Sequence, residues 1–361
     1  MKIDRVTLRK VRGSFDWDGT FWESRLARPI DIYPEYRNAM PFWGGTQDSE
    51  GKFRLSNVFL EIGTDEGLTG VFGPTSDAVG YIIATQLREL LLGKDPLASE
   101  LLWDQMHRSL VHGRQGEAMW AVSVVDCALW DLEAKTKNKR VWDLIGINNL
   151  SPQITAYTLS LESPKSMYNQ ALENSFRPLL KTKLGGGEQD IARIEQVRLG
   201  APNSRIIVDA NEGWSPELYN ELAPVLVRLG VEMVEQPFPA DDDDALLEIE
   251  RVLPVCADES CHDSTSLKNL KDKYDIINIK LDKTGGLTEA LKLKSIALSD
   301  GYKIMVGCMV GSSLAMAPAT LLAQGIEFVD LDGPLLLSQD RNYPLKYDLN
   351  GVYPPEKELW G

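Results

Sequence analysis

Hydrophobic and polar positions follow two different patterns along the chain, and the change falls at about Gln153. Before that point, two segments alternate apolar and polar residues as strands do, at 3–11 and 53–63. The turn sequence GTDEGLTG and a short run, VFG, follow, which predicts an antiparallel meander. Helices are expected at 76–92, 96–110 and 117–137, with apolar residues at clear helical spacing in the last. Strands followed by helices predict an α+β capping domain over residues 1–145.

After Gln153, short apolar runs alternate with segments of helix length. The runs are ITAYTLSL, PLLKTKL, RIIVDANEGW, VEMVEQP, PVCADES, IINIKLDKTGG, KIMVGCM and EFVDLDGP. Helices are expected between them, for example at 188–200, 215–229, 243–252, 264–272 and 287–300. Eight β/α units predict an α/β fold, a closed (β/α)₈ TIM-type barrel over residues 146–335 with catalytic groups at the C-terminal strand ends. The tail, 336–361, is expected to pack back on the capping domain and complete it.

Three carboxylates end the predicted third, fourth and fifth strands: Asp209, Glu235 and Asp258. Adjacent strands of a barrel place such groups side by side, where like charges repel unless a cation neutralises them. Oxygen ligands of this kind suit Mg²⁺, which keeps further positions for water or substrate. We therefore predict one Mg²⁺ per subunit. The acidic run Asp241–Asp244 is instead interpreted as a solvated helix start.

Three lysines occupy the predicted second and sixth strands, which lie opposite each other in an eight-stranded barrel. Lys181 and Lys183 are two residues apart and share a face, so each is expected to lower the pKa of the other. Lys280 ends the sixth strand. Lys183 and Lys280 could therefore reach one carbon from its two sides, as proton removal and return require.

Two aspartates, Asp330 and Asp332, end the eighth strand on one face. Such a pair would bind a cationic group through charge-assisted hydrogen bonds, although capping of the following loop explains it as well. Together the residues suggest a substrate whose carboxylate binds the metal, whose α-carbon lies between the lysines and whose ammonium group reaches the aspartates. Bidentate metal coordination would stabilise the enediolate formed by proton removal.

Composition narrows the partners. The 361 residues carry a net charge of −15, which disfavours nucleic acid and anionic membranes as partners. The N-terminus lacks an apolar signal core, and no run approaches the about 20 apolar residues of a membrane helix. The four cysteines form no CxxC pair. We therefore expect a cytoplasmic protein with reduced thiols and a small-molecule substrate.

These motifs resemble the enolase superfamily, in its muconate-lactonising subgroup, and most of all the dipeptide epimerases. The resemblance rests on KxK at 181–183, VDANEGW, EQP, ADES, IKLDKTGG and the DLDGPLLL stretch at 330–337. It implies an isomerase that moves a proton at the C-terminal residue of an L,L-dipeptide. Lys183 and Lys280 are then the two bases, Lys181 tunes the first, and Asp330 and Asp332 hold the substrate's amino terminus. Related barrels assemble as homo-oligomers, either dimers or octamers.

Substrate specificity follows less directly from this resemblance. GCMVGSS at 307–313 looks like the substrate-lining stretch of epimerases, which adds Cys308 and Met309 to the expected site. Arg25, in the aromatic-rich segment 14–48, could pair with an acidic substrate side chain, and surface salt bridges explain it equally well. An L-Ala-Glu type substrate is the family's familiar case, but hydrophobic and basic side chains stay open.

Other activities also stay open. The capping domain looks more like acid-sugar dehydratases and mandelate racemases, yet none of the three histidines lies after the predicted seventh strand, where those relatives place one. Cycloisomerases and N-acylamino acid racemases share the metal and lysine pattern. A barrel without catalytic activity would be expected to lack a ligand or a lysine, and all are present.

Overall fold

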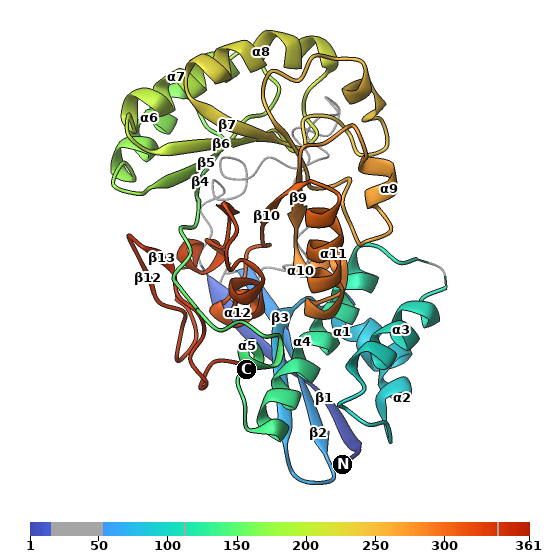
Figure 1. Cartoon of the computed structure of the whole chain (residues 1–361). Coiled ribbons are helices and arrows are strands. Elements are labelled where there is room, and N and C mark those ends of the chain that lie inside the picture. Colours follow the sequence, from blue (N-terminus) through green and yellow to red (C-terminus); the bar gives the residue numbers. More distant parts are fainter. Residues whose placement is uncertain (16–52, 112, 338) are drawn as a thin grey trace.

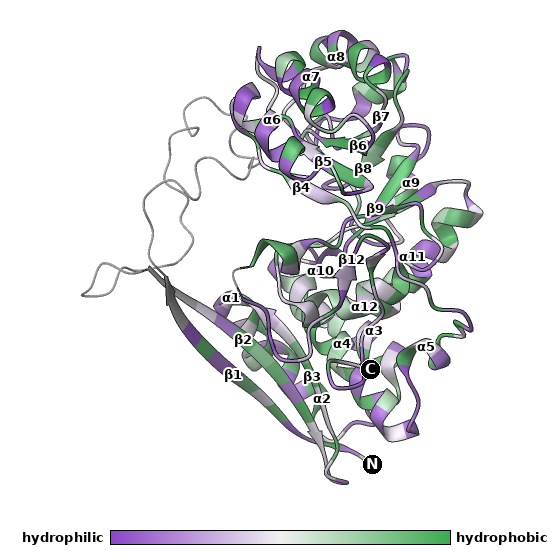
Figure 2. Ribbon diagram, turned by 90° about the vertical axis from the view of Figure 1, so that its left-hand side faces the viewer, coloured by the Kyte–Doolittle hydropathy of each residue, from purple (hydrophilic) through white to green (hydrophobic). Residues whose placement is uncertain are grey.

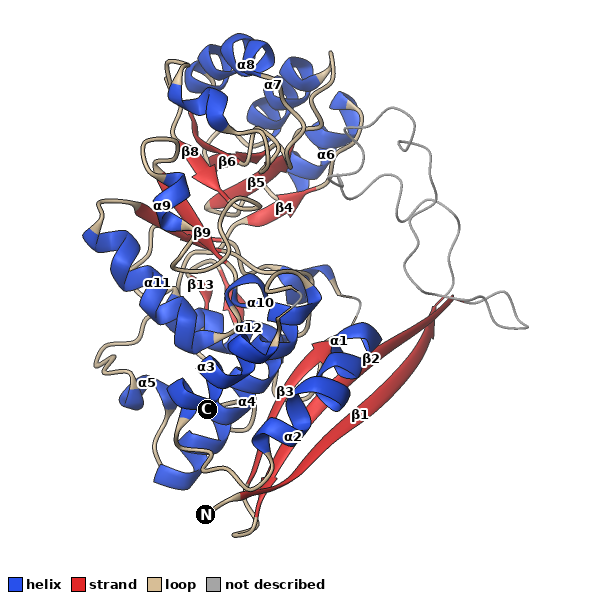
Figure 3. Cartoon of the chain, turned by 90° about the vertical axis from the view of Figure 1, so that its right-hand side faces the viewer, coloured by secondary structure: helices blue, strands red, loops and turns tan. Residues whose placement is uncertain are grey.

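The computed structural model describes residues 1–15, 53–111, 113–337 and 339–361 (Figure 1). The N-terminal part is an antiparallel sheet in the order β1-β2-β3, which confirms the predicted meander. Its strands are β1 (Ile3–Phe15), β2 (Phe53–Thr64) and β3 (Thr69–Thr75). Figure 3 shows this long sheet extending away from the rest of the molecule, with helices along one side.

Five helical segments and one π-helical turn accompany the sheet: α1 (Asp77–Ile82), η2 (Ile83–Leu87), α2 (Arg88–Leu91), α3 (Ser99–Ser109), α4 (Glu117–Lys137) and α5 (Val141–Leu144). Helix α4 is buried over most of its length and packs directly on β3. The approach is so close that a Cβ at Gly70 would lie 2.1 Å from the carbonyl oxygen of Ala128. A glycine is therefore required where the strand crosses the helix.

The second part is an eight-stranded parallel sheet in sequential order. Its strands are β4 (Tyr157–Leu159), β5 (Leu179–Lys183), β6 (Arg205–Asp209), β7 (Val231–Glu235), β8 (Val255–Ala257), β9 (Ile276–Ile279), β10 (Lys303–Val306) and β11 (Phe328–Val329). The first and last strands meet where the Ala156 amide donates to the Val329 carbonyl at 2.7 Å. The predicted barrel is thus confirmed.

A separate apolar cluster fills the inside of this barrel. It takes one side chain from each strand or from the residue just before it: Ala156, Leu179, Ile207, Met233, Cys256, Ile276, Met305 and Phe328. All eight are at most 3% exposed, so the interior is a packed core, as in other barrels of this type. Chemistry is therefore confined to the strand ends above this layer.

The larger helices of the barrel are α6 (Pro164–Glu173), α7 (Asp190–Gly200), α8 (Pro216–Arg228), α11 (Leu287–Ser299) and α12 (Ser313–Leu322). Shorter turns are η3 (Asp244–Leu247), α9 (Leu267–Leu270), α10 (Leu281–Thr284) and η4 (Gly333–Leu336). Figure 1 places α6, α7 and α8 outside β4 to β7. Figure 2 shows hydrophobic and hydrophilic residues mixed along these helices, and the buried residues of α8 recur three or four positions apart, at Tyr219, Leu222, Ala223 and Leu226.

The helix predicted over 243–252 is wrong in its length, because only the 3₁₀ turn η3 forms there. The interpretation of Asp241–Asp244 as a solvated helix start holds for the exposed Asp241, Asp242 and Asp244 but is wrong for Asp243. The Asp243 side chain is buried, where it accepts hydrogen bonds from the hydroxyls of Tyr274 and Ser260. These bonds hold the segment in a compact turn, and a regular helix would carry the carboxylate away from them.

The tail carries a small hairpin, β12 (Tyr347–Asp348) and β13 (Gly351–Val352), and then returns to α4. The Trp360 indole donates to the Cys127 carbonyl at 3.0 Å, and the Gly361 amide donates to Asp131 at 3.0 Å. Trp360 is 1% exposed. The end of the chain thus packs against the N-terminal part.

The two parts also meet at the connection that follows β9. The Trp103 indole donates to the Gly285 carbonyl at 2.7 Å. Asp126 of α4 accepts a hydrogen bond from the backbone amide of Thr288, in the first turn of α11, at 3.0 Å. A Cβ at Gly286 would lie 2.4 Å from an Asp126 carboxylate oxygen, so the pair of glycines lets the capping helix approach. Among the described residues, no helix combines the length and hydrophobicity needed to cross a membrane.

Candidate active site

Parallel register brings the predicted carboxylates to one level of the barrel. Lys183 of β5 is aligned with Asp209 of β6, and Asp209 with Glu235 of β7. Asp258 follows the last residue of β8 directly. All three carboxylate residues are at most 3% exposed. Each of these carboxylates comes directly after buried apolar residues at the carboxyl end of its strand, so the charges converge at the C-terminal mouth.

Lysine ammonium groups lie among these carboxylates. Lys181 Nζ is 3.0 Å from Asp209, 2.7 Å from Glu235 and 2.9 Å from Asp330. Lys183 Nζ is 2.6 Å from Asp209, on the same side. The two lysines of β5 therefore contact carboxylates at the ends of β6, β7 and β11, on both sides of β5 around the barrel mouth.

Lys280, directly after β9, contacts the opposite side of the cluster. Its Nζ is 2.5 Å from Asp258 Oδ2 and 4.0 Å from Glu235. A further lysine, Lys283, donates to Asp258 Oδ1 and to the Asp258 carbonyl. Asp258 is thus held by one ammonium group on each carboxylate oxygen.

The expectation that Lys181 has a lowered pKa is wrong in this structure. Burial by itself lowers the pKa of Lys181, but Asp209, Asp330 and Glu235 outweigh burial and raise it well above its usual value. The pKa of Lys280 is raised in the same way, against burial, chiefly by Asp258. A neighbouring lysine lowers the pKa of an ammonium group, but the carboxylates that closely surround each ammonium group have the larger effect.

The pKa values of the carboxylates are shifted in different directions. Burial raises the pKa of Glu235 to about 7, and the nearby Asp209 adds to that effect. Burial acts on Asp209 as well, but Lys181 and Lys183 overcome it and keep its pKa below the ordinary range. Glu235 is therefore the member of the trio with too little positive charge around it.

The donor set fits a divalent cation. Within the described parts of the chain, no three acidic, histidine or cysteine side chains are already gathered at metal-binding spacing, because lysines stand between the carboxylates. Yet Glu235 Oε2 is buried, and among the described residues it has only an ion pair with Lys181 Nζ at 2.7 Å, without hydrogen-bond geometry, while burial and nearby like charges raise the pKa of Glu235. Three carboxylates at one level are hard ligands of the kind Mg²⁺ prefers.

Four further polar residues, which the sequence analysis did not select, surround the cluster. Asn211 Oδ1 accepts from Lys183 Nζ at 2.8 Å, and Asn278 Nδ2 donates to Glu235 Oε1 at 2.7 Å. Burial and the neighbouring Asp258 raise the pKa of Glu259 to about 8. Lys283 is the fourth. Asn278 precedes Lys280 by two residues on a strand, and that spacing was a usable signal for it.

The aspartates after β11 lie where the sequence placed them. Asp330 pairs with Lys181, and its buried Oδ1 receives no hydrogen bond from any residue that the structure describes. Asp332 Oδ2 accepts from the Thr158 amide of β4 at 2.7 Å, and burial together with Asp330 raises its pKa to about 7. The capping alternative is thus only partly met, because this bond goes to β4 and not to the following loop.

The remaining predicted residues differ in position. Cys308 is half-buried directly above β10, where burial and then Asp330 raise the pKa of its thiol. Met309 is 46% exposed beside it. Arg25 and the segment 16–52 lie outside the described residues.

Two domain families match the chain. Residues 49–146 match the family described as mandelate racemase / muconate lactonizing enzyme, N-terminal domain. Residues 167–348 match the family described as enolase C-terminal domain-like. The first match includes β2 to α5, and the second runs from within α6 to the end of β12.

Two curated relatives span most of the chain. The chain is 44% identical to L-Ala-D/L-Glu epimerase of Escherichia coli over 302 residues, which is 83% of this chain and 91% of that protein. It is 46% identical to N-acetyl-D-glutamate racemase of a Pseudoalteromonas species over 242 residues, 67% of this chain and 76% of the relative.

Two solved structures extend the similarity to the whole fold. An enolase family member from Agrobacterium tumefaciens, bound to sodium and L-Ala-L-Glu, is 38% identical, with a TM-score of 0.77 over 99% of this chain and all of that chain. A dipeptide epimerase from Enterococcus faecalis, in complex with Mg and L-Leu-L-Tyr, is 26% identical, with a TM-score of 0.76 over 99% of this chain and 98% of that one.

Proposed function

Because the chain belongs to the mandelate racemase / muconate lactonizing enzyme family of the enolase superfamily, we propose that it is a Mg²⁺-dependent dipeptide epimerase. The proposed reaction inverts the α-carbon of the C-terminal residue of an L,L-dipeptide. The observation that carries the proposal is the placement of Lys183 and Lys280 on opposite strands, β5 and β9, with the carboxylates of β6 to β8 between them. Two bases on opposite sides of one site are what inversion through a planar carbon requires.

Asp209, Glu235 and Asp258 would hold the cation. A bound Mg²⁺ supplies Lewis-acid stabilisation of the negative charge that develops on a substrate carboxylate. A cation that neutralised Asp258 and Glu235 would also remove the charge that raises the pKa of Lys280, so that this ammonium group could more easily give up its proton.

Lys183 then takes the α-proton from one face, and Lys280 delivers a proton to the other. Asn211 orients Lys183 through its 2.8 Å hydrogen bond, and Asp209 holds the same ammonium group from a second direction. Lys181 contacts carboxylates on three strands and keeps them near the lysine pair. These contacts fix the amines, which limits the reorganisation needed during proton transfer.

Asp330 and Asp332 would bind the substrate's ammonium group. The buried Asp330 Oδ1 lacks a donor, and an ammonium group can supply one through a charge-assisted hydrogen bond. Cys308 and Met309 would lie along the substrate. The relatives named as dipeptide epimerases support a dipeptide as the substrate.

A second candidate is racemisation of an N-acylated amino acid such as N-acetylglutamate. It is favoured by the 46% identity to the racemase from Pseudoalteromonas. The metal and the lysines would act identically, but an acylated nitrogen carries no charge to bind Asp330. The two candidates therefore differ in the group that occupies the β11 end of the site.

Deuterium exchange separates the two candidates. The enzyme, Mg²⁺ and either mixed L,L-dipeptides or their N-acetyl counterparts are incubated in D₂O and followed by mass spectrometry and NMR. We expect a one-unit mass gain at the C-terminal α-carbon of free dipeptides, with new L,D signals that also reveal the preferred side chain. Turnover of acetylated compounds alone would replace the epimerase by the racemase. The proposal includes a cytoplasmic, homo-oligomeric enzyme, and light scattering would measure the assembly.

A further inference from the structure

Gln236, the residue directly after Glu235, ties together three neighbouring strand ends. It is fully buried, and its φ of +35° is a backbone conformation that residues other than glycine rarely adopt. Its amide donates to the Cys256 carbonyl of β8 at 2.8 Å, and its carbonyl accepts from the Glu212 amide after β6 at 2.8 Å. A backbone held in such a conformation needs strong surroundings to maintain it.

The Gln236 side chain extends this link to the loop that carries Asp258. Oε1 accepts from the Asp258 amide at 2.9 Å and from the Ser260 amide at 3.1 Å. The amide group therefore connects the residue next to one proposed metal ligand with the backbone of another. If the side chain turned over, Nε2 would face two N–H groups, and both bonds would be lost.

The contacts of the amide nitrogen, Nε2, show what prevents this rotation of the side chain. Nε2 lies 2.9 Å from Ser260 Oγ and 3.0 Å from Tyr274 Oη, and it also donates to the Phe238 carbonyl at 2.9 Å. Nε2 carries two protons, so one serves the Phe238 carbonyl and the other is shared between the two hydroxyl oxygens, whose own protons must point elsewhere. Asp243 Oδ2 can accept from both hydroxyls, at 2.8 Å from Ser260 and 2.7 Å from Tyr274, and the two hydroxyls also lie 3.0 Å from each other.

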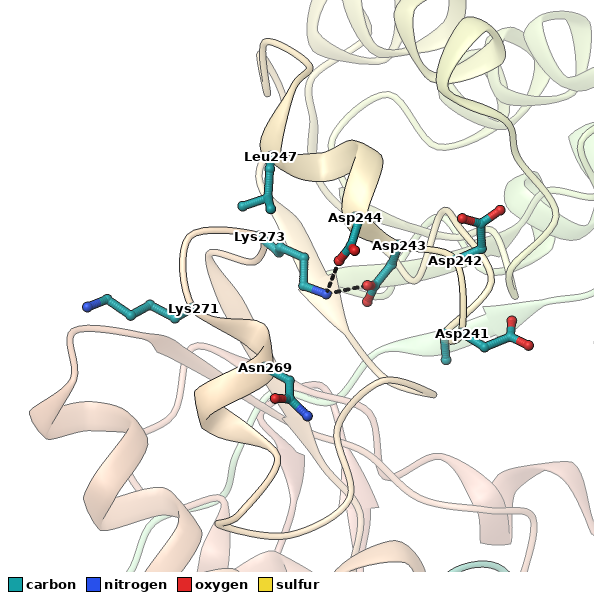
Figure 4. A pocket seen from close by; sticks show the side chains of 9 residues that line it. Asp241, Asp242, Asp243, Asp244, Leu247, Asn269, Lys271 and Lys273 are labelled. Carbon is teal, nitrogen blue, oxygen red and sulfur yellow. Dashed lines mark hydrogen bonds and ion pairs between the residues drawn. The ribbon is translucent and has the colours of Figure 1, made fainter.

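An ionised carboxylate can only accept hydrogen bonds, so Asp243 attracts the hydroxyl protons and leaves the hydroxyl oxygens turned toward Nε2. Its other oxygen receives the Lys273 ammonium group. Asp243 and Lys273 line a surface pocket beside η3 (Figure 4). The neighbouring Asp244 also pairs with Lys273, at 3.1 Å, but its side chain is 88% exposed, and among the described contacts it does not touch the hydroxyls. Asp244 is therefore a matched control for Asp243.

We propose that Asp243 is a positioning residue: acting through Ser260, Tyr274 and Gln236, it fixes Glu235 and Asp258 in the arrangement that binds the divalent cation. This inference rests on the proposed metal site. Residues behind a metal ligand commonly change affinity or activity by about 10- to 100-fold when they are altered. In this chain, a residue remote from the substrate would thereby set the metal affinity of the site.

The test compares Asp243→Asn with Asp244→Asn in full-length protein, with Mn²⁺ as the probe, by electron paramagnetic resonance titration. Both substitutions remove a charge next to Lys273, but only the first places an amide donor among the hydroxyl donors. We expect the Mn²⁺ dissociation constant to rise by about 10-fold or more in Asp243→Asn and to stay unchanged in Asp244→Asn. Activity lost in Asp243→Asn should recover at saturating metal, which a general structural defect would not allow.

A second pair of variants covers the case in which Asp243→Asn does not fold. Tyr274→Phe removes a hydroxyl of the network, whereas Tyr219→Phe removes a buried hydroxyl that donates to the Leu253 carbonyl at 2.8 Å. Only Tyr274→Phe should weaken Mn²⁺ binding. Equal Mn²⁺ affinities in folded Tyr274→Phe, or in folded Asp243→Asn, and the wild type would overturn the inference. Absence of Mn²⁺ binding to the wild type would instead overturn the proposed metal site itself.

Discussion

Lys183 and Lys280 have different partners, and this difference makes their separate roles measurable. Lys183 is held by Asp209 and Asn211, whereas Lys280 is held by Asp258. Replacing either lysine by alanine removes the base on one face, and inversion should fall by about 100-fold or more. The lysine that remains can still remove and return a proton on its own face. Each variant should therefore exchange deuterium into one epimer only, L,L or L,D, and the two variants into opposite epimers, as followed by NMR in D₂O.

Lys303→Ala provides the control for these two variants. This lysine lies at the other end of the barrel, at the start of β10, where its exposed side chain pairs with Glu327. The variant should keep full activity with both epimers. If Lys183→Ala and Lys280→Ala exchanged the same epimer, the two lysines would not act on opposite faces, and the proposed division between them would be wrong.

At the same scale, the sequence predicted the charged residues that end apolar runs and missed the residues that hold them. Asp209 and Glu235 stand where a buried strand meets the mouth of the barrel, so pattern alone locates them. Gln236 follows the pattern equally well, but its importance depends on which loop atoms face its amide. Hydrogen-bond direction between loops depends on tertiary structure and leaves no trace in residue spacing.

Helices could be predicted from the sequence where one face of the helix is polar and the other is apolar. Helix α4 follows its predicted range, whereas no range was predicted for α12. Nine of the ten residues of α12, SLAMAPATLL, are buried, so no polar stripe marks a helical period, and Pro318 lies inside it. The 243–252 segment failed for the opposite reason. Its charges suggest a helix start, but tertiary hydrogen bonds to Asp243 determine its shape.

The contact between helices α4 and α11 gives a pH prediction at this scale. Burial raises the pKa of Asp126 from 3.8 to about 7, even though Thr288 donates two hydrogen bonds that favour the ionised form. Between pH 3.8 and 7 the folded protein thus keeps a proton that the unfolded chain has released. Stability from this group is complete at low pH and is lost as pH rises through 7, by up to about 1.4 kcal/mol per pH unit.

Urea unfolding of the wild type and Asp126→Asn over a pH series measures this effect. The asparagine cannot ionise, so the difference in unfolding free energy between the two proteins should shift in favour of the variant from acidic to neutral pH. Parallel stability curves would show that Asp126 is ionised throughout, because the Thr288 hydrogen bonds and the N-terminus of α11 then outweigh burial.

For the whole molecule, the acidic surface and the buried charge cluster make different contributions to cation dependence. A net charge of −15 means that any salt relieves repulsion across the surface, in proportion to ionic strength. The site adds a specific effect, because Glu235 is buried close to the like charges of Asp209 and Asp258, which raise its pKa. A cation bound there stabilises the folded state only, by about 4 kcal/mol when its concentration is 1,000 times its dissociation constant.

Thermal unfolding with Mg²⁺ and with NaCl at matched ionic strength separates the two contributions. We expect Tm of the wild type to rise further in Mg²⁺ than in NaCl, and EDTA to remove the difference. Glu235→Gln keeps the hydrogen-bonding shape of the side chain but removes the charged ligand, so it should respond equally to both salts. A Mg²⁺-specific increase that persisted in Glu235→Gln would place the cation elsewhere, since a site that loses a central carboxylate ligand cannot retain its affinity. The stabilisation by Mg²⁺ would then come from cations bound at the protein surface. The negative charges of the carboxylates at the barrel mouth would be neutralised by the lysines alone.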